Sequence, residues 1–140
     1  MTTARTDEII AFAKDLKKQW GSDPINIANR LGIRVIFDES GEVRAHTMKM
    51  PNYPTIISIY GCKDSVSRQV LCAHELGHAL LHNDVLNKYS GSYRSIVNQT
   101  EYEANLFAVA LLFDESDFNM PLRQMNNYLL KGVLDFNIKQ

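Results

Sequence analysis

The sequence has little of what marks several specialised classes of protein. Its 140 residues include only two cysteines, Cys62 and Cys72, which do not indicate a disulfide framework. The longest apolar run, Leu106 to Phe113, is far shorter than the ~20 residues that a transmembrane helix needs. Fifteen basic and sixteen acidic residues give a net charge of −1, without the basic excess typical of nucleic-acid-binding domains. We therefore expect neither a membrane partner nor direct binding to nucleic acid.

The beginning of the sequence also lacks the pattern of a secretory signal peptide. Asp7 and Glu8 stand where a basic segment followed by an apolar one would be expected. Cysteines that form no disulfide framework are typical of a reducing compartment. These two features predict a cytoplasmic location.

The distribution of apolar residues predicts one α+β domain spanning residues 1–140. A hydrophobic fraction of 45% and a charged fraction of 22% are ordinary for a globular chain of this length. Periodicity and start signals predict helices at residues 4–20, 24–31, 65–82, 100–113 and 122–133, and strands at 33–37, 42–48 and 55–60. The polar segment 84–98 is predicted to be a loop, with Thr100 and Glu103 as a capping box that opens the next helix. Strands that are separate from most helices are typical of an α+β fold, in which the two most apolar helices should pack against the sheet.

Residues 74–78 carry the most specific chemical signal in the sequence. They read His74-Glu75-Leu76-Gly77-His78, which is an H-E-x-x-H motif. Because histidines four residues apart lie on one face of a helix, both imidazoles can bind a single metal ion. Glu75 lies beside them and can act as a base on a water molecule that the metal activates. Two nitrogen ligands, a carboxylate base and an open metal position are what a zinc hydrolase needs.

A catalytic zinc site usually has three protein ligands, so one more ligand must be found. His82 lies about 12 Å along a straight helix from His74, which disfavours a shared metal ion, and we expect it to close the helix, bonding a last carbonyl or lying in the core. Asp84 would be the third ligand in the metzincin pattern, but Leu81 replaces the glycine that turns the chain back. Cys72 points about 200° away from His74 and is expected in the core.

The next predicted helix offers two carboxylates, Glu101 and Glu103. They point about 200° apart, so only one can face the metal. Apolar periodicity does not choose between them because this helix is apolar on nearly every side, and both can also be first-turn acids that complement the helix dipole. The small residues Ala104 and Ala108 on the side of Glu101 would allow a close approach to the metal helix. Asn105, one turn after Glu101, can accept a hydrogen bond from a ligand histidine and fix its tautomer.

Two segments of the sequence together resemble a known family. Residues 74–82 read HELGHALLH and residues 101–108 read EYEANLFA. Together they resemble the ImmA/IrrE family of metallo-endopeptidases, within the larger group of zinc peptidases that combine HExxH with a glutamate ligand. The segment 111–114 departs from the family, because it reads Leu-Leu-Phe-Asp where members commonly have a Leu-Leu-Met-Pro-like sequence.

The resemblance implies a fold, a cofactor and a partner. The fold is a small zincin-like domain in which a sheet of about three strands packs against the metal-binding helix and further helices. The implied site has zinc bound by His74, His78 and Glu101, with Glu75 as the catalytic base and Asn105 in contact with a ligand. The implied reaction is limited cleavage of a protein partner, typically a helix-turn-helix transcriptional repressor of a prophage, mobile element or stress response.

Peptide hydrolysis also needs a group that stabilises the oxyanion of the transition state. His46 and Tyr60 lie in predicted strands, whereas Tyr93 and Arg94 lie between the two predicted metal helices. Any of the four can donate a hydrogen bond, and the sequence does not rank them. An exposed strand edge would in addition be able to hold an extended peptide by adding it to the sheet.

Two other functions remain open from the sequence. The first is a non-cleaving protein-interaction module that zinc stabilises, since metal binding can contribute directly to folding. Glu75 argues against it, because a structural metal site needs no base. The second is a DNA-binding regulator, which the balanced charge and the lack of a helix-turn-helix pattern disfavour.

Overall fold

The computed structural model, which describes residues 3–82 and 93–139, confirms the predicted α+β fold. Its helices are α1 (Thr3–Trp20), α2 (Pro24–Arg30), α3 (Ser65–Leu81), α5 (Tyr93–Leu112) and α6 (Asn127–Phe136). Its strands are β1 (Arg34–Asp38), β2 (Arg44–Met48) and β3 (Ile56–Tyr60). Two short 3-10 helices cover Glu115–Asp117 and Leu122–Gln124. The single predicted helix at 122–133 is therefore wrong at its start, because the side chain of Asn126 caps a new helix by accepting the N–H of Leu129 at 2.9 Å.

The strands of the described chain form one mixed sheet in the order β1-β3-β2. The central strand β3 pairs in parallel with β1 and antiparallel with β2. Its side chains Ile57 and Ile59 are fully buried, as expected for a β-branched central strand. On β2, Ala45 and Thr47 are half-buried whereas His46 is exposed. One face of the sheet therefore packs against helices and the other faces solvent.

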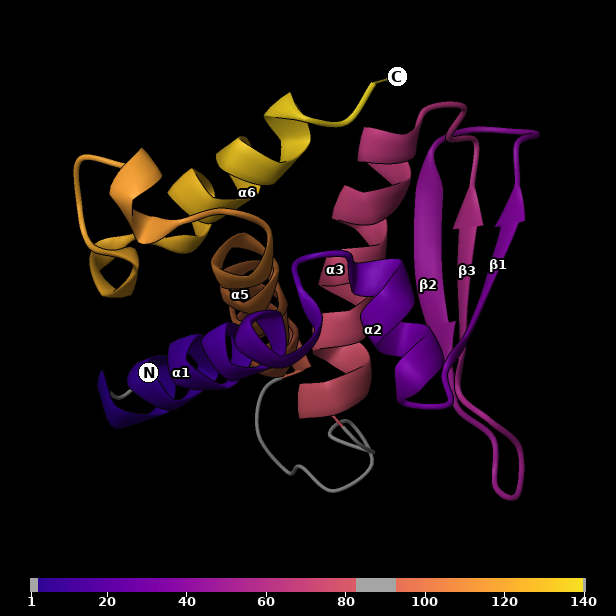
Figure 1. Cartoon of the computed structure of the whole chain (residues 1–140), viewed down its shortest axis with the longest axis horizontal. Coiled ribbons are helices and arrows are strands. Elements are labelled where there is room, and N and C mark those ends of the chain that lie inside the picture. Colours follow the sequence, from indigo (N-terminus) through magenta and orange to yellow (C-terminus); the bar gives the residue numbers. More distant parts are fainter. Residues whose placement is uncertain (1–2, 83–92, 140) are drawn as a thin grey trace.

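The helix that carries the H-E-x-x-H motif, α3, lies between the sheet and α5. Figure 1 shows α3 running beside β2, with α5 on its other side and α1 and α6 packed against α5. The side chain of Asp64 caps α3 by accepting the N–H of Ser67 at 2.9 Å. Leu76 of α3 is fully buried, and Phe107 of α5 is fully buried beside Gly77 of α3. Packing on both sides thus fixes the position of α3.

The C-terminal end of α3 is tied to the sheet by Lys49, the residue after β2. Its ammonium donates hydrogen bonds to the carbonyl oxygens of Ala79 at 2.8 Å and His82 at 3.0 Å. The last carbonyls of a helix have no donors within the helix, and a cation there also complements the helix dipole. Lys49 therefore satisfies the end of α3 and holds it against the sheet.

The helix α5 begins at Tyr93, well before the start that the sequence predicted. The predicted loop is therefore wrong for residues 93–98, and its first part lies outside the described residues. The predicted capping box is also wrong, since the hydroxyl of Thr100 donates to the carbonyl of Val97 at 3.0 Å within the helix. Glu101 and Glu103 consequently lie in the interior of α5, so the helix dipole does not explain them.

The helices α3 and α5 approach each other closely at Gly77. A Cβ atom built at this glycine would lie 3.1 Å from Cα and 3.2 Å from the carbonyl oxygen of Ala104, both in the backbone of α5. It would also lie 3.3 Å from the ring of Phe107. Small residues at positions 77 and 104 thus allow the separation at which a side chain of α5 reaches the metal motif.

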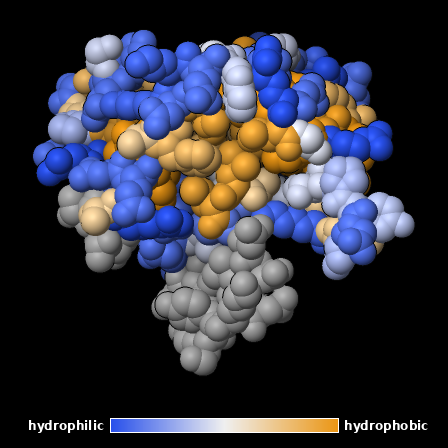
Figure 2. All heavy atoms as spheres, turned by 60° about the horizontal axis from the view of Figure 1, so that its bottom comes forward, coloured by the Kyte–Doolittle hydropathy of each residue, from blue (hydrophilic) through white to orange (hydrophobic). Residues whose placement is uncertain are grey.

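Apolar side chains also reach the molecular surface. Figure 2 shows them gathered in the middle of the face that looks downward in Figure 1, with polar side chains around them. The large apolar residues that are more than a third exposed include Phe12 (37%), Leu31 (39%) and Met48 (45%), which come from separate elements. None of the helices in the described part of the chain has the length and apolar character needed to cross a bilayer.

Replacement of Gly77 tests the close contact between α3 and α5. We expect Gly77→Ala to lower the free energy of unfolding by about 1–3 kcal/mol, because backbone atoms of Ala104 block the new methyl group. Gly132→Ala is the matched control, since Gly132 also lies in a helix and a methyl group added there would have no other atom within 4 Å. There alanine should raise stability by up to about 1 kcal/mol. Thermal unfolding followed by circular dichroism measures both, and equal effects would contradict the close contact.

Candidate metal centre

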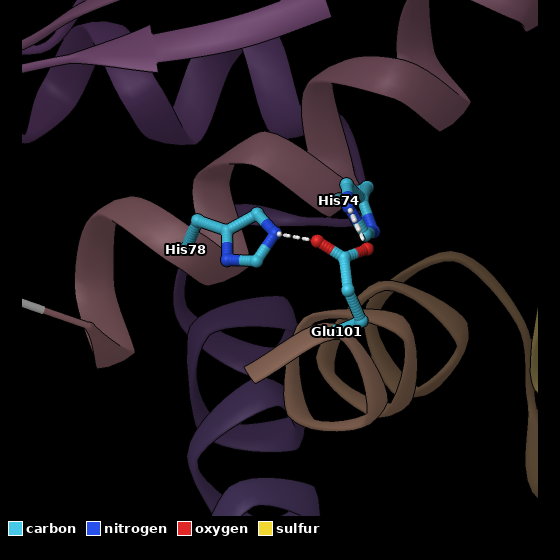
Figure 3. Close-up of side chains that lie close together, drawn as sticks. All are labelled: His74, His78 and Glu101. Atoms are coloured by element: carbon cyan, nitrogen blue, oxygen red, sulfur yellow. Dashed lines mark hydrogen bonds and ion pairs between the residues drawn. The ribbon is translucent and has the colours of Figure 1, made fainter. Parts of the chain in front are cut away.

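The structure brings together His74 and His78 of α3 and Glu101 of α5. The Nε2 atom of His74 lies 3.2 Å from Oε2 of Glu101, and Nε2 of His78 lies 3.0 Å from Oε1 (Figure 3). The possible ligand atoms of the three residues all lie within 4.8 Å of one another. The side chain of Glu101 is 43% exposed, so solvent reaches this cluster.

The cluster fits a divalent metal ion. Two ligand atoms at the usual distance from a tetrahedral zinc ion lie about 3.3 Å apart, close to the 3.0 Å and 3.2 Å that separate the nitrogens from the carboxylate oxygens. Two imidazoles and one carboxylate are also the ligand types of a hydrolytic zinc centre, with one position left for water or substrate. A His/His/Glu set accepts several divalent metals, so these residues define a metal site without naming the metal.

The charges of the cluster depend on one another. Hydrogen bonds with His74 and then with His78 hold the pKa of Glu101 well below its ordinary value. Burial lowers the pKa of His74, but the hydrogen bond and the charge of Glu101 outweigh it, with smaller contributions from Glu75 and Asn105, so that this pKa is raised overall. Glu101 is therefore ionised at neutral pH, in the form that binds a cation.

Glu75 is held by the neighbouring strand. It is only 8% exposed, and its Oε1 atom accepts a hydrogen bond of 2.7 Å from the hydroxyl of Thr47 on β2. The same hydroxyl lies 3.2 Å from the backbone carbonyl oxygen of Glu75. Thr47 therefore fixes the rotamer of the carboxylate that stands next to His74 in the motif.

Asn105 contacts His74, one turn along α5 from Glu101. Its amide nitrogen donates to Oδ1 of Asn127 at 2.7 Å, and its hydrogen bond with His74 raises the pKa of that histidine. A hydrogen bond that raises the pKa of an imidazole is one in which the imidazole donates, so the amide oxygen of Asn105 is the acceptor. This is the contact that the sequence predicted for Asn105, although its effect on metal binding stays a prediction.

The two carboxylates of α5 have separate partners. Glu103 is buried and does not reach His74 or His78, because it faces His82 at 2.8 Å and Arg5 of α1 at 3.1 Å. Burial raises the pKa of Glu103, but hydrogen bonds from His82, Arg5 and Gln99 outweigh this effect and hold it at about 2. The geometry therefore separates Glu101, which belongs to the cluster, from Glu103, which does not.

The comparisons with known proteins agree with this geometry. A family model described as the IrrE N-terminal-like domain, of the M78 peptidases, matches residues 28–139, which is most of the chain. The chain belongs to this family. The resemblance inferred from the two sequence segments is thus confirmed, and so is the zincin-like arrangement of sheet and metal helix. No curated protein matches the sequence.

Membership of this M78 family supports a metallopeptidase-type function.

The structure also shows where the remaining predicted site residues lie relative to the metal cluster. His46 and Tyr60 pack ring to ring, with centroids 5.5 Å apart, on the face of the sheet opposite to Thr47. The structure therefore does not bring them to the metal cluster. Tyr93 and Arg94 begin α5, but their side chains lie outside the described part of the chain, as does Asp84.

The two cysteines and His82 are placed mainly as expected. Cys72 is fully buried, and burial raises the pKa of its thiol to about 12; Cys62 is also buried, and both cysteines are free.

His82 ends α3, as predicted, with its backbone N–H donating to the carbonyl of His78 at 3.0 Å. Of the two alternatives predicted for its side chain, the bond to a last carbonyl is wrong, because Lys49 takes the carbonyls. The imidazole is only 9% exposed, close to the predicted core position, and turns to His78 and Glu103.

Sequence reasoning missed three residues that hold the site, namely Thr47, Glu103 in its actual role, and Arg5. Of the three, only Thr47 could have been found from the sequence. It is a hydroxyl residue on the same face of its strand as Ala45, the face that packs against the helices. Glu103 was recognised only as an alternative to Glu101. Arg5 is 98 residues away from Glu103 in the sequence, and nothing local marks it.

Metal analysis of purified variants tests the cluster. Wild-type protein loaded with zinc should hold about one ion per chain, whereas His74→Ala, His78→Ala and Glu101→Ala should each lose it because a three-ligand site does not tolerate the loss of a ligand. His46→Ala is the matched control, since it removes an exposed histidine on the far side of the sheet. Metal retained by all three cluster variants, measured by atomic emission after dialysis, would contradict the assignment.

Proposed function

We propose that this protein is a zinc-dependent endopeptidase that makes a limited cleavage in a helix-turn-helix transcriptional repressor of a prophage, mobile element or stress response. The observation that carries the peptidase chemistry is the meeting of His74, His78 and Glu101, with their ligand atoms within 4.8 Å, beside a buried Glu75. The M78 family membership supports the reaction class. The resemblance of the two sequence segments to ImmA/IrrE proteins supports the choice of partner.

The residues around the site suit peptide hydrolysis. When bound, zinc supplies a Lewis acid that activates a water molecule and polarises the peptide carbonyl. Glu75 accepts the proton of the attacking water and passes it to the leaving amine, as a positioned carboxylate can. Thr47 keeps the carboxylate of Glu75 in one orientation while it does so. This division of roles explains why Glu75 is held by β2 and is not part of the His74–His78–Glu101 cluster.

A cavity beside the cluster is suited to a substrate side chain. Its volume is about 160 Å³, and His74 and Glu101 form part of its wall. The apolar part of the wall consists of Val70, Leu71, Leu134 and Ile138, and its polar part also includes Asn105, Lys131 and Asp135. The apolar part of a cavity of this size would accept one medium-sized apolar side chain. We therefore expect cleavage next to residues such as leucine or isoleucine.

The edge strand β2 is suited to hold the substrate backbone. In the described part of the chain it pairs on one side only, with β3, and Thr47 places it directly beside Glu75. An extended peptide could add to this edge by main-chain hydrogen bonds. Such binding requires an unfolded or exposed segment, which would confine cleavage to a few bonds of a folded partner.

Replacement of the proposed base separates cleavage from metal binding. We expect Glu75→Gln to keep about one zinc ion per chain and to lower the rate of peptide cleavage by roughly 10²–10⁴-fold, because an amide accepts no proton. The substrates to use are purified helix-turn-helix repressors encoded near the gene for this protein, with products identified by mass spectrometry. Cleavage by Glu75→Gln at the wild-type rate would sink the proposal. Zinc binding and repressor binding without cleavage by the wild type would favour the non-cleaving module.

Replacement of Thr47 tests how Glu75 is oriented. Thr47→Val keeps the shape of the side chain but removes the hydroxyl that donates to Glu75 at 2.7 Å. We expect kcat to fall about tenfold, the effect of losing one orienting hydrogen bond, with little change in KM or zinc content. Thr47→Ser, which keeps the hydroxyl, should retain most of the activity. Equal kcat values for the valine and serine variants would show that the hydroxyl plays no part.

A further inference from the structure

The imidazole of His82 lies between a residue of the metal cluster and a buried carboxylate. Its Nδ1 atom is 3.1 Å from Nδ1 of His78, and its Nε2 atom is 2.8 Å from Oε1 of Glu103. The side chain of His82 is only 9% exposed and that of Glu103 only 5%. Both contacts are therefore shielded from water, where a hydrogen bond has its largest effect on orientation.

The direction of these hydrogen bonds follows from the chemistry at the two ends. At one end, Nε2 of His78 faces the metal cluster, so a neutral His78 that binds metal through this atom carries its proton on Nδ1. That N–H must donate to Nδ1 of His82, which leaves the proton of a neutral His82 on Nε2. At the other end, this second N–H donates to the carboxylate of Glu103. Every nitrogen in the chain of contacts is then satisfied, and no imidazole has to be charged.

The direction is reversed when a neutral His78 carries its proton on Nε2 and donates it to Glu101. Nδ1 of His78 would then need a donor, and His82 would have to supply one N–H to His78 and another to Glu103. Only a positively charged His82 has both N–H groups. The observed contacts therefore suit two neutral histidines when a metal ion occupies Nε2 of His78.

The carboxylate at the end of this chain is itself firmly held. Arg5 of α1 donates to both oxygens of Glu103, with Nε at 3.2 Å from Oε2 and Nη2 at 3.1 Å from Oε1. The amide of Gln99 donates to Oε2 at 3.0 Å. A bidentate guanidinium fixes the plane of a carboxylate as well as its charge. Glu103 thus presents a fixed acceptor to His82.

We infer that His82 and Glu103 form a relay that positions His78 for metal binding, holding its ring in the Nδ1–H tautomer with Nε2 directed at the metal. The inference rests on the proposed metal site. A ligand histidine usually donates its second N–H straight to a carboxylate or carbonyl, which raises its basicity and fixes its orientation. Here a second histidine extends that connection, because Glu103 faces His82 and Arg5 rather than His78. His82 and Glu103 are positioning residues, since they act through His78.

Metal affinity measured with zinc ions alone tests the relay. His82→Phe keeps a ring of similar size but accepts no hydrogen bond, and we expect it to weaken zinc binding by roughly 10–100-fold in competition with a chromophoric chelator. Glu103→Gln keeps an acceptor but loses the charge, so a smaller loss is expected. The controls are His46→Phe and Glu39→Gln, which make the same changes at exposed positions. Wild-type affinity in both relay variants would overturn the inference.

Nitrogen NMR of the histidine rings gives a second test that needs no variant. In zinc-loaded wild-type protein labelled with ¹⁵N-histidine, we expect the proton of His78 on Nδ1 and the proton of His82 on Nε2. A proton on Nδ1 of His82, with or without one on Nε2, would overturn the relay. Neither readout depends on peptidase activity. A protein that binds zinc with these tautomers but cleaves no repressor would therefore sink the proposed function and leave the relay standing.

Discussion

The close contact between α3 and α5 determines where the polar groups of the site lie. Neither helix holds a complete ligand set, because the motif on α3 supplies two nitrogens and the carboxylate must come from α5. A glutamate side chain spans only a few ångströms, so the helix backbones have to approach closely. Gly77 allows this approach from within the motif itself, facing the backbone of Ala104 three residues after Glu101. Gly77 of the H-E-L-G-H motif is therefore a packing residue. It contributes to the site by allowing α5 to come close enough for Glu101 to reach the two histidines.

Close packing around a polar site requires that every buried polar group finds a partner. In the described part of the chain, no buried side-chain nitrogen or oxygen lacks one. The partners come from different elements: β2 holds Glu75 through Thr47, α6 holds Asn105 through Asn127, and α1 holds Glu103 through Arg5. The residues nearest the proposed metal are thus fixed by contacts that spread over most of the fold. Such a site is pre-organised, which favours metal binding because little side-chain freedom remains to be lost.

The sequence allowed the fold class and the two histidines of the metal cluster to be predicted, because both depend on local patterns. Histidines four residues apart on a helix lie on the same face. The β-branched run at Ile56–Tyr60 is typical of a buried strand. The choice of Glu101 over Glu103 needed either the family resemblance or the structure, since both residues lie on a helix that is apolar on nearly all sides. The start of α5 was misplaced because Thr100 and Glu103 imitate a capping box, whereas their actual partners are Val97 and His82. The link from Arg5 to Glu103 was not predictable, because the two residues are 98 positions apart in the sequence and no local pattern joins them.

The position of Arg5 has a consequence for how the site is built. It belongs to α1, which precedes residues 28–139 that match the family model, so the matched region contains the proposed ligands but not all of their support. The side chain of Arg5 is 40% exposed, but that of Glu103 is only 5% exposed, so this bidentate pair is not an ordinary surface ion pair. Loss of Arg5 would leave the buried carboxylate with partners in His82 and Gln99 but without its guanidinium. We therefore expect the loss of Arg5 to lower the thermal stability and, through Glu103 and His82, the metal affinity as well. In the proposed relay, α1 thus supports the metal centre although it lies outside the matched region.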